Sequence, residues 1–190
     1  MRARLKDNMR LASVPCGIME DLLRLPTKNF ENISLVGLDL DEESLLLAAK
    51  NAKSKGIGYA SFQKQDAWNL GEENTFDMLT SNGLNIYESD PTRRTALFES
   101  FFKALKPGGT LVASFLTPPP ALNAASPWKD VVMQDAITQR ALFVDVIGAK
   151  WQNFDMPDDI TAQLEAIGYK DIQILPDPNW VMPTVVATKP

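Results

Sequence analysis

Residues 33–43 read Ile-Ser-Leu-Val-Gly-Leu-Asp-Leu-Asp-Glu-Glu, the pattern of a buried strand followed at once by a helix. Residues 33–40 form an apolar run, which is typical of a strand that is covered on both faces. Asp41 is a suitable helix N-cap, because its carboxylate can accept hydrogen bonds from the first free backbone amides. Glu42 and Glu43 then lie in the first turn, where the helix dipole favours anions. This stretch therefore indicates a parallel sheet flanked by helices.

The same alternation of β-rich runs and helical patterns extends outward to both ends of the chain. We expect strands at residues 11–15, 33–40, 59–64, 75–81, 110–116, 171–175 and 184–188. We expect helices at residues 19–25, 42–55, 91–105, 128–147 and 159–167, and a tight turn at residues 106–109.

The last two strands are separated only by residues 176–183, too few for a helical crossover, so they should pair antiparallel. The sequence thus predicts an α/β fold: a three-layer αβα sandwich around a doubly wound, mostly parallel seven-stranded sheet whose last strand is antiparallel.

Length and charge limit the classes of protein to which the chain can belong. Its 190 residues fit one domain, residues 1–190, and the net charge is −5. An acidic chain lacks the positive field that nucleic acids and anionic membranes require, so we expect neither as a partner. Arg93 and Arg94 form an adjacent basic pair, which we interpret as a solvated helix face.

The numbers of cysteine and histidine residues limit the kinds of active site that the chain can form. Cys16 is the single cysteine, so no internal disulfide can form and a reducing, cytoplasmic location is expected. The basic N-terminus lacks the apolar run of a secretory signal, and no run has the length of a membrane span. The absence of histidine removes His-based triads, His general bases and most zinc sites. We expect no metal. Any chemistry must use carboxylates, Tyr, Cys or Lys, or else a reactive cofactor that needs little help from the protein.

Ligands of open α/β sheets bind outside the carboxyl ends of the strands, so the turns there are candidate sites. Gly17 follows the first strand, and a turn that presses its backbone against a ligand needs a residue without a Cβ. Asp39 ends the second strand, 22 residues after Gly17, which is a suitable position for binding ribose hydroxyls. A helix-capping role for Asp39 is the alternative, but Asp41 already fills that role.

The next two turns also carry polar side chains. Asp66 follows the third strand and could accept a hydrogen bond from an exocyclic amine such as that of adenine, or could form an Asx turn. Asn82 follows the fourth strand, where its amide could both donate to and accept from a ligand in the crevice.

In their order and spacing these motifs resemble the class I, Rossmann-like family of S-adenosylmethionine-dependent methyltransferases, and the resemblance covers residues 11–188. Residues 36–43 look like the second motif of that family, whose acid holds the ribose; this implies Asp39, with Leu40 against the adenine ring. Residues 65–67 are similar to the third motif, which implies that Asp66 contacts adenine and that the backbone amide of Ala67 supports it.

Three later stretches extend the resemblance. Residues 76–83 resemble the fourth motif, beside the methionine moiety and the substrate, which implies Asn82. Residues 105–111 match the family's turn into the fifth strand, and residues 164–169 match its last helix.

The first motif departs from the family, which has an acid at the strand end and then three glycines at alternate positions. Aligned on Gly17, the chain has Ser13 in place of the acid, Pro15 in place of the first glycine and Met19 in place of the third. Met19 leaves room for the cofactor only where its side chain turns away. Cys16 is expected to pack as a small residue beside this turn.

The resemblance implies in-line transfer of a methyl group from S-adenosylmethionine to O, N or C of a small-molecule substrate. No catalytic side chain is assigned. If a base is needed, the sequence offers Tyr87, Glu88 and Asp90 just beyond the fourth strand. It also offers Asp130, Asp135 and Asp145 within residues 117–155. The alternatives are an S-adenosylmethionine-binding or scaffold protein without transferase activity, and a nicotinamide-dependent oxidoreductase. The oxidoreductase is disfavoured because no G-x-G-x-x-G follows the first strand. The oligomeric state is left open.

Residues 117–155 break the alternation and form a long excursion after the fifth strand, where such insertions are usually functional. We expect this excursion to act as a lid on the substrate side. Its Trp128, Phe143 and Trp151 suggest an apolar or aromatic ligand, or else a core beneath the lid.

Overall fold

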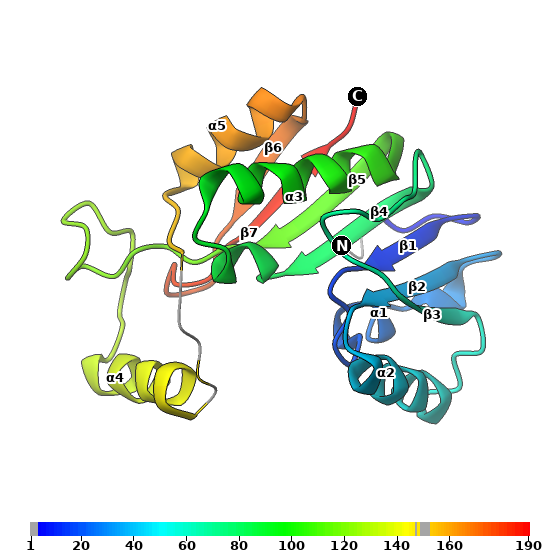
Figure 1. The fold of residues 1–190 in the computed structure, drawn as a ribbon, viewed down its shortest axis with the longest axis horizontal. Coiled ribbons are helices and arrows are strands. Elements are labelled where there is room, and N and C mark those ends of the chain that lie inside the picture. Colours follow the sequence, from blue (N-terminus) through cyan, green and yellow to red (C-terminus); the bar gives the residue numbers. More distant parts are fainter. Residues whose placement is uncertain (1–3, 147, 149–152) are drawn as a thin grey trace.

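The computed structural model describes residues 4–146, 148 and 153–190 (Figure 1). The strands are β1 Arg10–Ser13, β2 Ser34–Asp39, β3 Ala60–Lys64, β4 Phe76–Asn82, β5 Leu105–Ser114, β6 Lys170–Leu175 and β7 Thr184–Thr188. The α-helices are α1 Glu20–Leu23, α2 Glu42–Ser54, α3 Pro91–Ala104, α4 Met133–Ala141 and α5 Pro157–Ile167. Three short segments complete the list: the 3-10 turns η2 Thr27–Asn29 and η3 Leu84–Tyr87, and the π-helical η4 Leu142–Val146.

The seven strands form one sheet in the order β3-β2-β1-β4-β5-β7-β6. β1 to β5 pair in parallel, whereas β7 is antiparallel to both of its neighbours, β5 and β6. The predicted fold class is therefore confirmed, including the antiparallel last strand. The winding of the sheet reverses between β1 and β4, which are adjacent in the sheet although two strands separate them in the chain.

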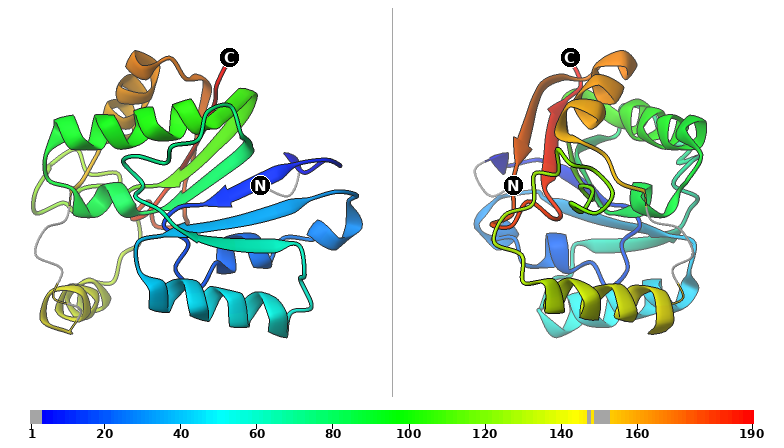
Figure 2. Two further views of the ribbon diagram at one scale, coloured as in Figure 1. Left: turned by 45° about the vertical axis from the view of Figure 1, so that its right-hand side comes forward. Right: turned by 90° about the vertical axis from the view of Figure 1, so that its left-hand side faces the viewer.

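Helices cover both faces of the sheet, as the figures show: α3 and α5 lie on one side, and α1 and α2 on the other (Figures 1 and 2). Neighbouring strand residues alternate between the two cores, as the pleat of a strand requires. Ala12 packs in the core that holds Phe98 and Leu164, whereas Leu11 packs in the core that holds Leu22 and Ala48. The apolar strands seen in the sequence are buried on both faces for this reason.

Several predicted boundaries were wrong by a few residues, and three of these differences concern the starts of α1, β5 and α4. α1 begins at Glu20 because Met19 adopts a left-handed backbone conformation, which cannot belong to the helix. Residues 106–109 are not a separate turn, since β5 starts at Leu105 and pairs with Phe76 before a register shift. The helix expected from residue 128 begins at Met133.

The excursion at residues 117–155 lies beyond the edge of the sheet at which the parallel strands end, and α4 stands away from the sheet there (Figures 1 and 2). The indole N–H of Trp128 lies 3.2 Å from the carbonyl oxygen of Thr117 and 3.0 Å from its hydroxyl oxygen, which fixes the start of the excursion. At the other end of the excursion, the Asp155 N–H donates a hydrogen bond of 2.8 Å to the Leu116 carbonyl. This bond holds the two ends of the excursion together. Trp151 and the side chain of Phe143 lie outside the described residues.

Within the described part of the chain, no helix combines the length and the apolar character that crossing a bilayer would require.

Candidate functional site

The carboxyl ends of β1, β2, β3 and β4 meet at one edge of the sheet, and the point where the winding reverses lies between β1 and β4. Two backbone hydrogen bonds hold the turn after β1 at this edge. The Val14 N–H donates to the Thr80 carbonyl of β4, and the Cys16 N–H donates to the Leu38 carbonyl of β2, both at 2.9 Å. The turn is thereby fixed over the place where open α/β sheets bind ligands.

Gly17 is the residue of this turn that faces open space. Its φ of +47° lies in the left-handed region, and a Cβ added to it would meet no heavy atom within 4 Å. The backbone of Gly17 can therefore be approached closely from outside, which a ligand-binding turn requires.

Met19, which stands in place of the family's third glycine, does not obstruct this space. Its φ is +59°, and its side chain is completely buried in the core that also holds Leu22 and Leu35. The side chain is thus turned into the protein, as the departure from the first motif required.

Asp39 joins the turns after β1 and β2. Its Oδ2 accepts a hydrogen bond from the Gly17 N–H at 2.9 Å, and its Oδ1 accepts one from the Asp41 N–H at 3.0 Å. Asp41 is the N-cap of α2, and its carboxylate accepts from the N–H groups of Glu43 and Ser44. The capping alternative for Asp39 is therefore wrong. Each oxygen of Asp39 retains a second lone pair for a ligand hydroxyl.

Leu40, which follows Asp39, is 56% exposed although it is large and apolar. It extends the edge formed by Gly17 and Asp39 with an apolar side chain, which suits contact with a flat aromatic ring.

Asp66 forms the Asx turn that was left open as an alternative: its Oδ1 accepts from the Trp68 N–H at 3.0 Å. This leaves Oδ2 without a hydrogen-bond partner among the described residues. Ala67 is buried, and no acceptor for its N–H lies within the described ranges. A carboxylate oxygen and a backbone N–H are thus both unengaged at the end of β3, the pair that an amino-substituted purine edge would use.

Asn82, the last residue of β4, is exposed, and its Oδ1 accepts a hydrogen bond of 3.1 Å from the Ser114 hydroxyl at the end of β5. Its amide nitrogen has no acceptor among the described residues. The structure therefore places Gly17, Asp39, Leu40, Asp66, Ala67 and Asn82 on consecutive strand ends of one edge.

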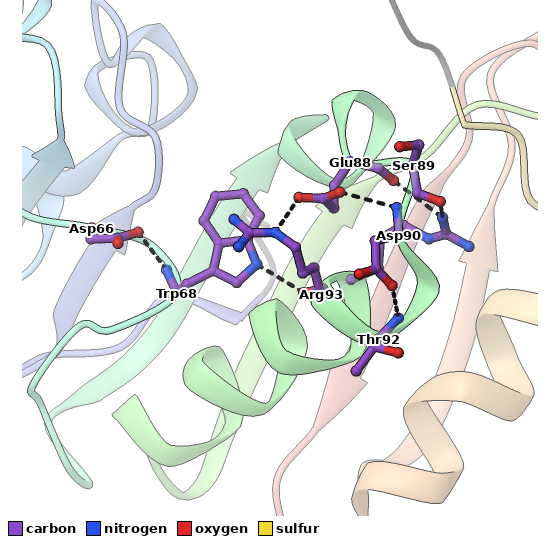
Figure 3. Close-up of polar contacts among 8 residues, drawn as sticks. Asp66, Trp68, Glu88, Ser89, Asp90, Thr92 and Arg93 are labelled. Atoms are coloured by element: carbon purple, nitrogen blue, oxygen red, sulfur yellow. Dashed lines mark hydrogen bonds and ion pairs between the residues drawn. The ribbon is translucent and has the colours of Figure 1, made fainter.

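Sequence reasoning missed the contact that ties the turn after β3 to α3. The Trp68 indole N–H donates to the Arg93 carbonyl at 2.8 Å, and the Arg93 guanidinium lies over the Trp68 ring, 5.1 Å from its centroid (Figure 3). The same guanidinium forms an ion pair of 2.7 Å with Glu88. Arg94 donates to the backbone carbonyls of Glu88 and Ser89. Arg93 is exposed, as expected of a solvated helix face, whereas Arg94 is partly buried.

The acids named as possible bases have other roles or are solvated. Hydrogen bonds from the Asp90 N–H and the Arg93 side chain lower the pKa of Glu88, so it is a weak base. Asp90 caps α3 by accepting from the Thr92 N–H at 2.8 Å (Figure 3). Tyr87 is 46% exposed, and the remaining three acids, Asp130, Asp135 and Asp145, are exposed.

Cys16 is buried, and this burial together with the nearby carboxylates of Asp39 and Asp21 raises the pKa of its thiol to about 12. Thiols of such high pKa are poor nucleophiles, so Cys16 fits a packing role. Among the residues that the structure describes, no group of three His, Cys, Asp or Glu side chains could hold a metal ion.

This arrangement can be compared with known proteins. The sequence profile of a family described as a methyltransferase domain matches residues 5–153. The chain belongs to this methyltransferase family. The seven-stranded sheet with its antiparallel last strand places the methyltransferase domain in the class I, Rossmann-like group, as the motif order predicted.

Three solved structures are similar to this methyltransferase domain. A possible exported protein from Bordetella parapertussis is 42% identical with a TM-score of 0.92, and the match covers 100% of this chain and 64% of that one. A SAM-dependent methyltransferase from Methanosarcina mazei is 18% identical with a TM-score of 0.71, over 98% of this chain and 95% of that one. Phosphoethanolamine N-methyltransferase 2 from Haemonchus contortus, in complex with S-adenosyl-L-methionine, is 16% identical with a TM-score of 0.68, over 100% and 50%.

The chain thus spans about two thirds of the Bordetella protein and half of the Haemonchus enzyme. The two more distant structures support the fold alone. No curated protein sequence matches the chain.

Proposed function

We propose that this methyltransferase domain binds S-adenosylmethionine and transfers its methyl group to a small-molecule acceptor. The observation that carries the proposal is the hydrogen bond of 2.9 Å between the Gly17 N–H and Asp39, at a turn whose Gly17 faces open space. A carboxylate fixed beside a glycine turn at the strand ends is the arrangement that binds the ribose of a nucleoside cofactor.

The neighbouring turns supply the contacts that the rest of a nucleoside needs. Asp39 accepts from the ribose hydroxyls through its remaining lone pairs, and Leu40 packs against the adenine ring. Ala67 donates its unengaged N–H to a ring nitrogen of adenine, while Oδ2 of Asp66 accepts from the exocyclic amine. These residues come from the ends of β2 and β3, which are adjacent in the sheet.

When bound, S-adenosylmethionine supplies an activated methyl group on a sulfonium sulfur. The chain's own contribution is then proximity and alignment, which can lower a barrier by roughly 7–11 kcal/mol without a protein nucleophile. Asn82 and Ser114, at the ends of β4 and β5, would then present polar groups to the methionine moiety and the acceptor. Since the cofactor carries the reactive group and the protein only aligns it, the reaction does not require a histidine, and the chain has none.

The acceptor and the cellular location are part of the proposal. The net charge of −5 disfavours nucleic acids as acceptors, so we propose a small molecule that enters beneath the excursion at residues 117–155. A single, buried cysteine is consistent with the reducing cytoplasm. Of the aromatic side chains expected near the acceptor, Trp128 is engaged with Thr117.

Isothermal titration calorimetry of the purified chain tests the first half of the proposal. S-adenosylmethionine and S-adenosylhomocysteine should bind at micromolar concentrations, whereas NAD and NADP should not bind. Absence of binding by both adenosyl ligands at high micromolar concentration would overturn the proposal, and saturable binding of NAD would favour the oxidoreductase.

Transfer is tested with methyl-tritiated S-adenosylmethionine and a panel of phenols, amines and carboxylic acids. Transfer of tritium to one acceptor class, with one S-adenosylhomocysteine released for each methyl group transferred, supports transfer when it is lost in Asp39→Asn. Binding without turnover over a panel that also includes thiols and carbon nucleophiles would leave a cofactor-binding protein instead.

A further inference from the structure

Two hydroxyl groups from adjacent strands converge on the carboxylate of Asp21. The Ser13 hydroxyl, at the end of β1, donates to Asp21 Oδ2 at 2.8 Å. The Thr80 hydroxyl of β4 donates to the same oxygen. Ser13 and Thr80 are register partners across the β1–β4 ladder, so Asp21 is anchored to both strands at once.

The place of Asp21 in the fold indicates that its carboxylate can reach a ligand. β1 and β4 are the two strands between which the winding of the sheet reverses, and ligands of open α/β sheets bind outside the strand ends at that point. Asp21 belongs to α1, the short helix that follows the turn of Gly17, and its side chain reaches back over these strand ends. The carboxylate therefore lies at the same crevice as Gly17 and Asp39.

The charge of Asp21 is not balanced within the described part of the chain. Its neighbour Glu20 forms ion pairs with Arg24 and Lys55, whereas no Lys or Arg described by the structure lies within 4 Å of Asp21. Its Oδ1 has no hydrogen-bond donor among these residues, and the two hydroxyl groups on Oδ2 hold the carboxylate without neutralising it. A partly buried carboxylate of this kind is complementary to a cationic ligand group.

The residue at the strand end itself cannot supply this charge. Ser13 is 2% exposed and uncharged, and its hydroxyl is already directed at Asp21. S-adenosylmethionine carries an α-ammonium group at the end of its methionine moiety. A cation of this type needs an anionic partner when it leaves water.

Taking the proposed function as given, we infer that Asp21 binds the α-ammonium group of the methionine moiety, so that the anionic contact comes from α1 and not from the strand end. Ser13 and Thr80 act as positioning residues that fix the carboxylate.

The test compares two ligands that differ in this group. S-adenosylhomocysteine carries the ammonium, and 5′-methylthioadenosine lacks the whole amino-acid portion, while both are thioethers with the same nucleoside. In Asp21→Asn, calorimetry should show affinity for S-adenosylhomocysteine reduced roughly 10- to 100-fold, the range of a charge-assisted hydrogen bond, and affinity for 5′-methylthioadenosine changed less than about twofold. Glu20→Gln is the matched control, because it removes one carboxylate from the same helix and should change neither affinity.

A second variant moves the carboxylate from α1 to the end of β1. Ser13→Asp in the Asp21→Asn background returns a carboxylate to the strand end, and it should restore most of the affinity for S-adenosylhomocysteine.

Equal losses for both ligands would show that Asp21 only supports the turn, and no loss for either would show that it contributes to neither affinity. Both outcomes would overturn the inference while leaving the proposed function intact. If the unmodified chain binds neither ligand, the proposed function fails, and the inference fails with it.

Discussion

The Gly17 N–H donates a hydrogen bond of 2.9 Å to Oδ2 of Asp39, across 22 residues of chain. This contact joins the turn after β1 to the turn after β2, and it sets the carboxylate beside the open side of Gly17. Since the Asp41 N–H occupies the other carboxylate oxygen, Asp39 is held at both oxygens before any ligand binds. A preorganised carboxylate loses little rotamer freedom on binding, which favours affinity.

Replacement of Asp39 should weaken every nucleoside ligand. Asp39→Asn removes the charge and leaves only one carbonyl oxygen for the N–H groups of Gly17 and Asp41. Calorimetry should show S-adenosylhomocysteine and 5′-methylthioadenosine both weakened roughly 10- to 100-fold, because both contain the ribose. Asp41→Asn, an equal change of charge two positions away, should leave both affinities unchanged. Loss of affinity for one ligand alone would contradict the ribose assignment.

A methyl group at Gly17 should act mainly on binding. Gly17→Ala places a Cβ at a φ of +47°, at a cost of roughly 1–2 kcal/mol in the free energy of unfolding, although no atom of the chain obstructs it. The methyl group projects into the open space of the crevice, so affinity for S-adenosylhomocysteine should fall at least about tenfold. Gly71→Ala is the control, with a φ of +65° and equally open surroundings. Urea unfolding should show similar destabilisation of both variants, and an equal loss of affinity in both would contradict the prediction.

The fold and the edge that carries Gly17 and Asp39 were predictable because their signals are local. A buried strand followed by an N-cap can be recognised within residues 33–43, and the structure confirms both β2 and the cap at Asp41. The positions of Gly17 and Asp39 follow from strand ends, whose residues must meet at one edge of a parallel sheet. The role of Asp66 was harder to predict from the sequence, because an Asx turn and adenine binding use the same side chain.

The remaining contacts depend on packing between segments distant in sequence. Thr80 lies 59 residues from Asp21, and Arg93 lies 25 residues from Trp68. A sequence pattern shows which residues occur at strand ends, but it does not show which side chains of a neighbouring helix turn back toward them. The inward orientation of Met19 likewise depends on a left-handed backbone conformation that large residues seldom adopt.

The cap at Asp41 should give the stability of the protein a defined pH dependence. Hydrogen bonds from the Ser44 hydroxyl, the Ser44 N–H and the Glu43 N–H lower the pKa of Asp41 below its ordinary value of 3.8. A pKa that is lower in the folded state stabilises the fold above the unfolded-state pKa, and this stabilisation is lost as the pH falls through the folded-state pKa. Wild type should therefore resist urea better than Asp41→Ala at pH 7, and the difference should shrink progressively in acid. A difference that is the same at neutral and acid pH would contradict this.

The thiol of Cys16 should be unreactive in the folded protein. Its pKa of about 12, raised by burial and then by Asp39 and Asp21, leaves very little thiolate at pH 8. Iodoacetamide should therefore fail to label the native chain and should label it fully in urea, as followed by mass spectrometry. Cys16→Ser should retain affinity for S-adenosylhomocysteine. Rapid labelling of the native chain would contradict a packing role.

The Trp68–Arg93 contact should matter for the adenine end of the site, because it ties the turn of Asp66 and Ala67 to α3 (Figure 3). Trp68→Ala removes both the hydrogen bond to the Arg93 carbonyl and the ring beneath the guanidinium, so affinity for 5′-methylthioadenosine should fall about tenfold. Trp68→Phe keeps a ring but loses the N–H, and it should be intermediate. Trp180→Ala is the matched control, since the centroid of the Trp180 ring, in the loop between β6 and β7, lies 5.7 Å from Lys129 of the excursion. Its loss should leave nucleoside affinity unchanged. Hydrogen exchange supplies a second measurement: the amide of Ala67 should exchange faster in Trp68→Ala than in Trp180→Ala when the ligand is bound. Equal affinities in the two alanine variants would mean that the tie to α3 does not position the turn.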